Sequence, residues 1–334
     1  MKTSVMVGLQ ILGIALCAVL AGLRVLLLLR QEFKTSLEIL GTVSMVIGAA
    51  FAIAAFSVWV EQGVQILRWA SQGLNEADIR LALSTPHIFK IIFAADLLHV
   101  ASLWFPKVAF LAVYTSAYRA FQPRLRLLFR VTVVVTTLTF LGSMAILTFY
   151  CYPIPRNWWV PQYPHAYTKV LTVPRDLKPP PGTALCLAVV QWPPIFVTCL
   201  LNIVSDFFIL AVPIVALLQL PRTEAQTQRY GVMAIVGLGF ISIGMTFYRM
   251  LAAKLGGYTE GRPLPIDQRN WYIFGTMVMV VSSLIAFSIP SLRVLVRKRR
   301  MEKSKSGNSV GDVYINIEMS RTEDWKAPMD LGGK

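Results

Sequence analysis

Charged residues are scarce in this chain, and acidic ones are scarcer than basic ones. Of its 334 residues only 15% are charged, with 17 acidic against 32 basic side chains, whereas 55% are hydrophobic. An ordinary soluble domain carries roughly 25% charged residues. A soluble fold of this size could not bury so much apolar surface. The composition therefore excludes a soluble cytosolic protein, and it excludes disorder over most of the length.

Cysteine and histidine are also rare, and their spacing matches no metal site. The four cysteines include no C-x-x-C pair, and the three histidines, His87, His99 and His165, are far apart in the sequence. This pattern excludes a small disulfide scaffold and gives no zinc signature. The sequence also lacks the motifs H-E-x-x-H, G-x-S-x-G and the P-loop. We therefore expect neither an enzyme nor a bound metal.

Long apolar runs are what the chain has instead. A bilayer core needs about 20 apolar residues per helix. Runs of that order predict an all-α, polytopic membrane protein with a bundle of seven transmembrane helices. The predicted spans are Val5–Leu29, Ile39–Val60, His87–Tyr118, Leu128–Tyr150, Leu185–Leu218, Val232–Ala253 and Trp271–Val294. The first run is too long for the apolar core of a signal peptide, so we interpret it as a true span.

These spans define the domain organisation. Residues 1–296 form the predicted seven-helix transmembrane domain. Within it, residues 151–184 form a large outer loop between the fourth and fifth helices, and its many Pro, Trp and Tyr residues are typical of an irregular segment at a membrane interface. Residues 297–334 are polar and predict a disordered cytoplasmic tail.

The distribution of Lys and Arg predicts the orientation of the spans. With the N-terminus outside, the inner connectors and the start of the tail hold more Lys and Arg than the outer segments. The positive-inside rule then favours an outer N-terminus and a cytoplasmic C-terminus, with the plasma membrane as the expected location. This topology also accounts for the net charge of +15, so we expect no nucleic-acid partner.

A basic run directly follows the last span. It consists of Arg297, Lys298, Arg299 and Arg300. We interpret it as a determinant of topology. The alternative is a contact with anionic lipid of the inner leaflet.

Polar side chains within the predicted spans mark the candidate site, because a charge in the bilayer core is costly unless it is paired or hydrated. The candidates are Asp96, His99 and Lys107 in the third span, Asn202 and Asp206 in the fifth, and Arg249 in the sixth. Helical periodicity places Asp96 and Lys107 on one face, and it places Asn202 and Asp206 together on another. Matching depths in the bilayer predict two ion pairs, Lys107 with Asp206 and Asp96 with Arg249.

The role of these pairs is open at this level. They either line a binding cavity or an ion path, or they form a structural lock between helices, as buried ion pairs often do. His99 is either a hydrogen-bonded interior residue or a ligand-binding residue. Pro106 in the third span, and Pro193 and Pro194 at the outer end of the fifth, are expected to interrupt these helices, either at kinks near a cavity or as tolerated breaks.

A ladder of small residues lies in the second span. Ser44, Gly48 and Ala52 follow one another at intervals of four residues. Such ladders let two helices approach closely. We expect this one to pack against a neighbouring helix of the bundle, and a dimer face is the alternative.

Two of the cysteines flank the large outer loop. Cys151 and Cys186 both fall on the oxidising side of the membrane in the predicted topology. We expect a disulfide between them, and the alternative is two unrelated thiols. Cys17 and Cys199 lie within spans and are interpreted as small apolar residues.

Five segments carry a family resemblance. The segment Leu201–Arg222 contains N-I-x-x-D followed by P-I, and the segment Lys107–Tyr118 begins with lysine and ends with tyrosine. The outer loop has the segment Cys151–Trp158 followed by Cys186. Further along, the segment TFYRM contains Arg249, and the segment Ile289–Leu295 contains P-x-L-R. Taken in order, these segments resemble the motifs of the fungal rhodopsin-domain family of integral membrane proteins. The resemblance covers about Ile39 to Leu295. It implies a seven-helix, receptor-like protein without an assigned ligand.

The sequence departs from the family pattern at several places, one of which is the absence of the Gly-rich stretch before the third span. Glu38 stands where the family has paired aspartates, and Gly275 and Met279 stand where it has a tryptophan and an acidic residue in the last span. A polar site shared by the family would therefore be incomplete here. Retinal is not an expected cofactor, because the last span has no lysine before Lys298 that could form the Schiff base.

The function expected from these observations is that of a receptor-like integral membrane protein. A small-solute transporter or permease is the alternative, and a scaffold without a ligand is a third interpretation. A transporter would be expected to show two related halves with broken helices in matching positions. The sequence shows no convincing internal repeat of that kind.

Overall fold

The computed structural model describes residues 2–30, 36–83, 85–117, 122–157, 188, 191–219, 226–255, 266, 269–286 and 288. The chain divides into two units, Met1–Ser291 and Leu292–Lys334, and all described residues belong to the first. Helices make up almost the whole of this described part, which contains no strand. The all-α prediction is confirmed. The predicted tail, the basic run from Arg297 to Arg300, and Cys186 lie outside the described residues.

The long helices follow the predicted spans closely. They are α1 (Thr3–Leu29), α2 (Ser36–Ser71), α4 (Pro86–Ala117), α5 (Pro123–Phe149), α7 (Trp192–Gln219) and α8 (Gln226–Leu255). Two short elements, α3 (Glu76–Leu83) and η2 (Ile154–Asn157), lie between them. The six long helices contain stretches that are long and apolar enough to cross a membrane. Residues 269–286 form a further helical run within the seventh predicted span.

Helix α2 is longer than predicted and ends at a specific turn. It continues past Val60, where the predicted span ends, to Ser71. Gly73 then adopts a left-handed conformation with φ of 83°. The N–H of Leu74 donates to the carbonyl of Trp69 at 3.2 Å, which is the Schellman arrangement that terminates many helices. Hydropathy marks only the part of a helix that lies in lipid, so the polar end of α2 was not predicted.

Two other helix starts differ from expectation. Helix α7 begins at Trp192, so Pro193 and Pro194 lie in its first turn, where a missing N–H interrupts no helical hydrogen bond. The prediction that these prolines interrupt the helix is therefore wrong. The short helix α3 was not predicted, and the side-chain oxygen of Asn75 accepts a hydrogen bond from the N–H of Asp78 (2.9 Å) at its start.

Helices α2 and α4 form an extensive contact with each other. A Cβ atom at Gly48 would lie 2.9 Å from Cβ of Phe105 and 3.1 Å from Cδ of Pro106, so only glycine permits this approach. Ser44 and Ala52, one turn to either side, are buried. The small-residue ladder therefore packs within the bundle, as expected.

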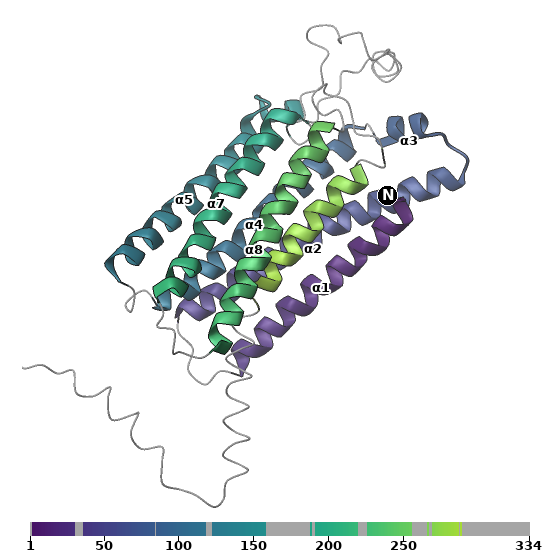
Figure 1. Cartoon of the computed structure of the whole chain (residues 1–334). Helices are drawn as coiled ribbons and strands as arrows, with labels where there is room; N and C mark the ends of the chain where they lie inside the picture. The colour runs from purple at the N-terminus through teal and green to yellow at the C-terminus, as the bar shows by residue number, and fades with distance from the viewer. Residues whose placement is uncertain are drawn as a thin grey trace, which may run out of the picture. The chain divides into compact units, whose positions relative to one another are not determined.

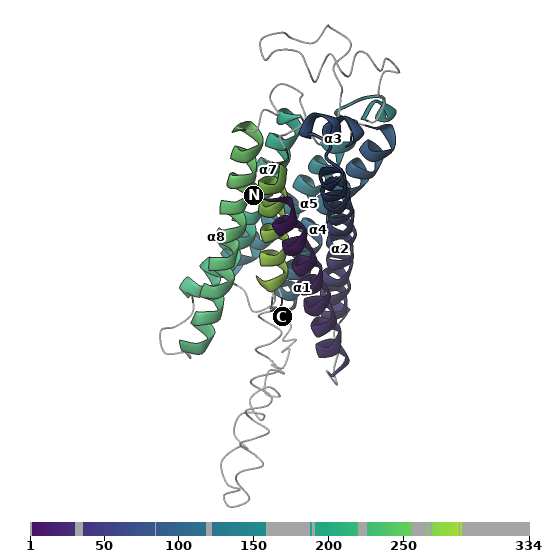
Figure 2. The same ribbon diagram turned by 90° about the vertical axis from the view of Figure 1, so that its right-hand side faces the viewer.

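The remaining helices extend this pair on both sides. Helix α1 packs on α2, α5 packs on α7, and α7 packs on α8. The helical run 269–286, drawn in yellow-green, lies between α1 and α8 in both views (Figures 1 and 2). Side-chain contacts agree with this arrangement, because Met277 lies against Gly13 of α1 and Tyr248 of α8 lies against Gly275. One apolar core, which includes Met45, joins these helices.

The surface of the helices is strongly apolar. Large side chains such as Val19, Leu138 and Phe207 are exposed on the outside of the long helices. An apolar surface of this extent is stable only when lipid covers it. We call the end of the bundle at which α3 lies, and at which α1 and α7 begin, the α3 end (Figure 2).

Candidate functional site

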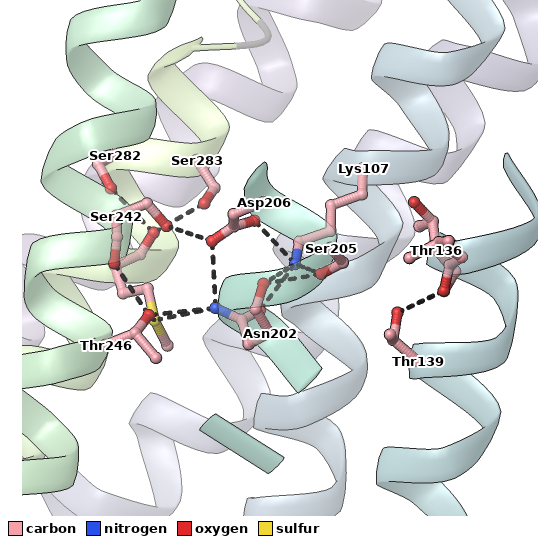
Figure 3. A network of polar contacts seen from close by, with 12 residues as sticks. Lys107, Thr136, Thr139, Asn202, Ser205, Asp206, Ser242, Thr246, Ser282 and Ser283 are labelled. Atoms are coloured by element: carbon pink, nitrogen blue, oxygen red, sulfur yellow. Dashed lines mark hydrogen bonds and ion pairs between the residues drawn. The ribbon is translucent and has the colours of Figure 1, made fainter. Parts of the chain in front are cut away.

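Lys107 lies at the centre of a buried polar network between α4 and α7 (Figure 3). Its Nζ is 2.8 Å from Oδ1 of Asp206, 2.7 Å from Oδ1 of Asn202 and 2.5 Å from Oγ of Ser205. An ammonium group has three N–H donors, so each has an acceptor. Lys107 and Asp206 are only 4% and 8% exposed. The sequence prediction of this ion pair is confirmed.

The amide of Asn202 is oriented by its two charged neighbours. Lys107 can only donate, so the amide oxygen faces it, and the NH₂ group faces the carboxylate of Asp206 (Nδ2 to Oδ2, 3.2 Å). Asn202 and Asp206 are four residues apart on α7, which places them on one face of the helix. The amide thus bridges the two members of the ion pair.

Helix α8 and the run 269–286 complete the network from the other side. Oγ of Ser242 donates to Oδ2 of Asp206 at 3.2 Å, and Nδ2 of Asn202 donates to Oγ1 of Thr246 at 3.1 Å. The sulfur of Met279 lies 2.9 Å from the same threonine oxygen. We call Lys107, Asn202, Ser205, Asp206, Ser242, Thr246 and Met279 the Lys107 network.

The charges of the Lys107 network balance. It contains one ammonium and one carboxylate, and its other members are neutral. Met279 stands where the family resemblance implies an acidic residue. A second carboxylate beside Asp206 would need another cation in this low-dielectric interior. The neutral thioether of Met279 is therefore compatible with a network in which the one ammonium is already paired with the one carboxylate.

A second cluster lies nearer the α3 end. Nη1 of Arg249 is 3.0 Å from Nε2 of His99, and Nη2 donates to the hydroxyl of Tyr272. The guanidinium carbon also lies 4.6 Å from the centre of the Tyr272 ring. We call these three residues the Arg249 cluster. His99 precedes Lys107 by eight residues on α4, so the two groups are about 12 Å apart along the helix axis.

The predicted ion pair between Asp96 and Arg249 is wrong. Lys107 and Asp206 form an ion pair, whereas the contacts of Arg249 within the described residues are to His99 and Tyr272. Asp96 is partly exposed, although its carboxylate lies in the electrostatic field of both Arg249 and Arg269. Depth matching placed Asp96 and Arg249 at similar heights, but it carries no information on lateral distance.

Several buried polar atoms have no hydrogen-bond partner in the part of the chain that the structure describes. They include Nε of Arg249, Nδ1 of His99 and Nε2 of Gln62. Trp59, one turn before Gln62 on α2, lies 5.6 Å from His99 between ring centres. Unpaired buried polar groups are costly in most proteins, so each calls for an explanation such as a functional role or a bound water or ion.

A small cavity lies on the other side of the Lys107 network, away from the α3 end. Its volume is about 40 Å³, which is room for about three water molecules. Lys107, Asp206, Ser242 and Ser283 contribute polar groups to its lining, and Phe110 is among its apolar residues. Within the described residues, no three His, Cys, Asp or Glu side chains are grouped as in a metal site.

Sequence reasoning missed the neutral members of both groups. Ser205, Ser242, Thr246 and Tyr272 contribute hydrogen bonds but carry no charge that would mark them in an apolar span. A helical wheel offers one signal, because Ser242, Thr246 and Arg249 follow the i, i+4, i+7 pattern of one face. Tyr272, Thr276 and Ser283 lie on the corresponding face of the last helix, together with Met279.

A comparison with known families identifies the chain. The family model described as the fungal rhodopsin domain matches residues 29–298, which is most of the chain. The chain belongs to the fungal rhodopsin domain family. It is accordingly a multi-pass membrane protein, and both polar groups fall within the matched residues of this fungal rhodopsin domain. No match was found among curated proteins or among solved structures.

The predicted disulfide remains a prediction. Cys151 is buried at the end of α5, but its expected partner Cys186 lies outside the described residues. Cys17 and Cys199 are free and buried, in agreement with their interpretation as small apolar residues.

Proposed function

We propose that this fungal rhodopsin domain is a receptor-like membrane protein in which the Lys107 network holds the helices in one of two arrangements. The observation that carries the proposal is the network itself. It joins α4, α7, α8 and the run 269–286 through one balanced and fully hydrogen-bonded ion pair. A buried ion pair favours the helix packing in which its charges are paired, and it disfavours packings in which the charges are separated but still buried. A two-state switch needs this property, because the helices then occupy distinct arrangements rather than a continuous range.

The position of the Arg249 cluster supports the same proposal. Arg249 follows Thr246 by one turn on α8, and Tyr272 precedes Met279 by two turns on the last helix. The two groups therefore share helix faces, so a ligand that moves Arg249 also moves the donors and acceptors of the Lys107 network. Coupling of this kind needs a bistable element that both sites contact.

The size of the cavity favours a switch over solute transport. At about 40 Å³ it holds a few water molecules beside Lys107 and Asp206, rather than a small organic solute. Hydration of this space provides a route to the second arrangement, because water can replace the hydrogen bonds of an ion pair as the helices separate.

Distance measurements between two helices test the switch without a ligand. Cysteines introduced at Leu127 on α5 and Met233 on α8, which are 64% and 61% exposed, would carry spin labels in a chain whose Cys17 and Cys199 are replaced by Ala. We expect the unaltered network to give one main distance. The double variant Lys107→Met with Asp206→Leu should add a second population, displaced by several ångströms.

The matched control removes buried hydroxyls outside the network. Thr136→Val with Ser143→Ala alters α5, which carries neither member of the ion pair, and should leave the distance distribution unchanged. If the network variant remains folded and gives the same single distance as the control, the network is a static lock and the proposed switch is wrong.

The orientation is part of the proposal. We propose that the N-terminus lies outside and the C-terminus in the cytoplasm, because this arrangement puts more Lys and Arg on the inner side. The plasma membrane is the location that we propose with this orientation. A reporter that works only in the cytoplasm should then be active when it is fused after Lys334. A reporter that works only outside the cytoplasm should be active when it is inserted near Pro180. The reverse result would exclude this topology and remove the argument for a disulfide at Cys151.

A further inference from the structure

His99 is a buried histidine whose protonation state is determined by its neighbour. It lies within α4, and its side chain is 0% exposed. Nη1 of Arg249 is 3.0 Å from its Nε2. A guanidinium group can only donate hydrogen bonds, so Nε2 must be the acceptor and carries no proton. The imidazole of His99 is therefore neutral, and its proton is on Nδ1.

A protonated His99 does not fit this arrangement. A proton on Nε2 would point at Nη1 of Arg249, so the hydrogen bond would be lost and two cations would face each other. Nδ1 has no acceptor among the described residues, so no carboxylate on the other side of the ring compensates the second charge. An uncompensated charge is costly in a low-dielectric interior. The packing of α4 against α8 at this point therefore requires a neutral His99.

Few titratable side chains lie near His99 on the helices around it. Within the described residues they are Arg249 on α8, Tyr272 on the run 269–286, Cys199 on α7, and Asp96 and Lys107 on α4 itself. Helix α2 contributes the neutral ring of Trp59, and the arginines of α5 lie near its start, away from the α3 end. Cysteine and tyrosine ordinarily titrate above pH 8, so His99 and Asp96 are the groups that an acid titration must separate.

We propose that His99 is a pH-sensitive latch between α4 and α8, which opens when its Nε2 takes up a proton from solvent and releases Arg249. In this step one N–H bond forms at Nε2 and the hydrogen bond from Nη1 breaks, while Arg249 keeps its protons and its charge. The inference rests on the proposed switch between two helix arrangements and adds its regulation. Acid favours the arrangement in which His99 is hydrated.

The direction of the pH effect follows from proton binding. The closed latch keeps His99 neutral, whereas a hydrated imidazole binds a proton below about pH 6.5. The open or unfolded state therefore binds more protons as the pH falls, so the closed packing is most stable above this pH and loses stability below it. For one histidine, the equilibrium constant for opening should rise about tenfold between pH 7.5 and pH 5.5.

Thermal unfolding of the purified full chain over this pH range tests the latch. The unfolding temperature of the unaltered chain should fall on acidification. His99→Gln keeps an amide oxygen that can accept from Arg249 but does not titrate, so the part of the fall that corresponds to about a tenfold change in the unfolding constant should disappear. An equal fall in the unaltered chain and in His99→Gln would overturn the proposal.

Two control variants accompany this measurement. His87→Gln makes the same change at an exposed position of α4 and should leave the pH dependence unchanged, because an exposed imidazole titrates alike in the folded and unfolded states. Asp96→Asn should retain the part of the pH dependence that His99→Gln removes. Its complete loss in Asp96→Asn, with no loss in His99→Gln, would assign the response to Asp96 and contradict the latch.

Nitrogen NMR keeps the test decisive if His99→Gln does not fold. In a chain with isotope-labelled histidine, in which the other two histidines are replaced by Gln, the spectrum at neutral pH should show a proton on Nδ1 and none on Nε2. The opposite tautomer, or an imidazolium at neutral pH, would contradict the hydrogen bond from Arg249 and overturn the proposal.

The spin-label distance between positions 127 and 233 separates the latch from the switch. Acid should add a second distance in the unaltered chain but not in His99→Gln. If the network variants give one distance while His99→Gln still removes the pH dependence of unfolding, the latch stands and the switch is wrong. If the network variants add a second distance while unfolding responds to pH equally with and without His99, the switch stands and the latch is wrong.

Discussion

Replacing Lys107 by Met, or Asp206 by Leu, should each lower the stability of the protein strongly. Each single change leaves the other charge buried without its ionic partner, which typically costs about 3–5 kcal/mol. The remaining neighbours, Asn202, Ser205 and Ser242, offer hydrogen bonds but no compensating charge. We expect a clearly lower unfolding temperature and a lower yield of folded protein for both variants.

The double change should recover much of this loss. Lys107→Met with Asp206→Leu leaves no unpaired charge, and replacement of a buried ion pair by apolar residues is often neutral or stabilising. Unfolding of the four proteins in one detergent would give the coupling energy between the two positions. Lys254→Met, a loss of positive charge at an exposed position, serves as the control. Losses that simply add in the double variant would contradict a direct interaction between the two side chains.

Substitution of Gly48 by Leu should be at least as damaging. A Cβ atom at this position would lie 2.9 Å from Cβ of Phe105 and 3.1 Å from Cδ of Pro106, and neither can rotate away because both belong to rigid parts of α4. The helices must separate to admit the larger side chain. Since the contact between α2 and α4 is extensive, we expect a cost of about 3 kcal/mol or more.

The matched control lies on α8. A Cβ atom at Gly244 would meet nothing within 4 Å, so Gly244→Leu should be tolerated and Gly244→Ala should be neutral or slightly stabilising. The measurement is the fraction of monodisperse protein after extraction, together with the unfolding temperature. If Gly48→Leu behaves like Gly244→Leu, α2 and α4 do not approach each other as the structure shows.

The ion pair of Lys107 and Asp206 could be predicted because burial and charge suffice to specify it. Two opposite charges at the same depth in lipid have few alternatives to meeting each other. The contact of Arg249 could not be predicted in this way, since its partners His99 and Tyr272 are neutral. A hydropathy profile treats tyrosine as an ordinary span residue, and only its place on one helix face with Thr276 and Ser283 distinguishes Tyr272 from an aromatic residue that faces lipid.

Serine and threonine present a related difficulty. In an apolar helix their hydroxyl groups can bond to the carbonyl of the preceding turn, as Thr246 does with Ser242 and Thr132 does with Leu128. The hydroxyl groups of such residues already have an acceptor in their own helix, so their presence predicts no tertiary contact. Thr246 also accepts from Asn202, and only the packing of α7 against α8 determines this second bond.

The end of α2 has a practical consequence. With 36 residues and a rise of 1.5 Å per residue, α2 is about 54 Å long, against a hydrocarbon core of about 30 Å. Its last three turns, the Gly73 turn and α3 form a continuous and hydrogen-bonded segment at one end of the bundle. An antibody fragment directed at this segment would be held rigidly by the α2–α4 pair, and would provide a fixed landmark for aligning images of so small a membrane protein by electron microscopy.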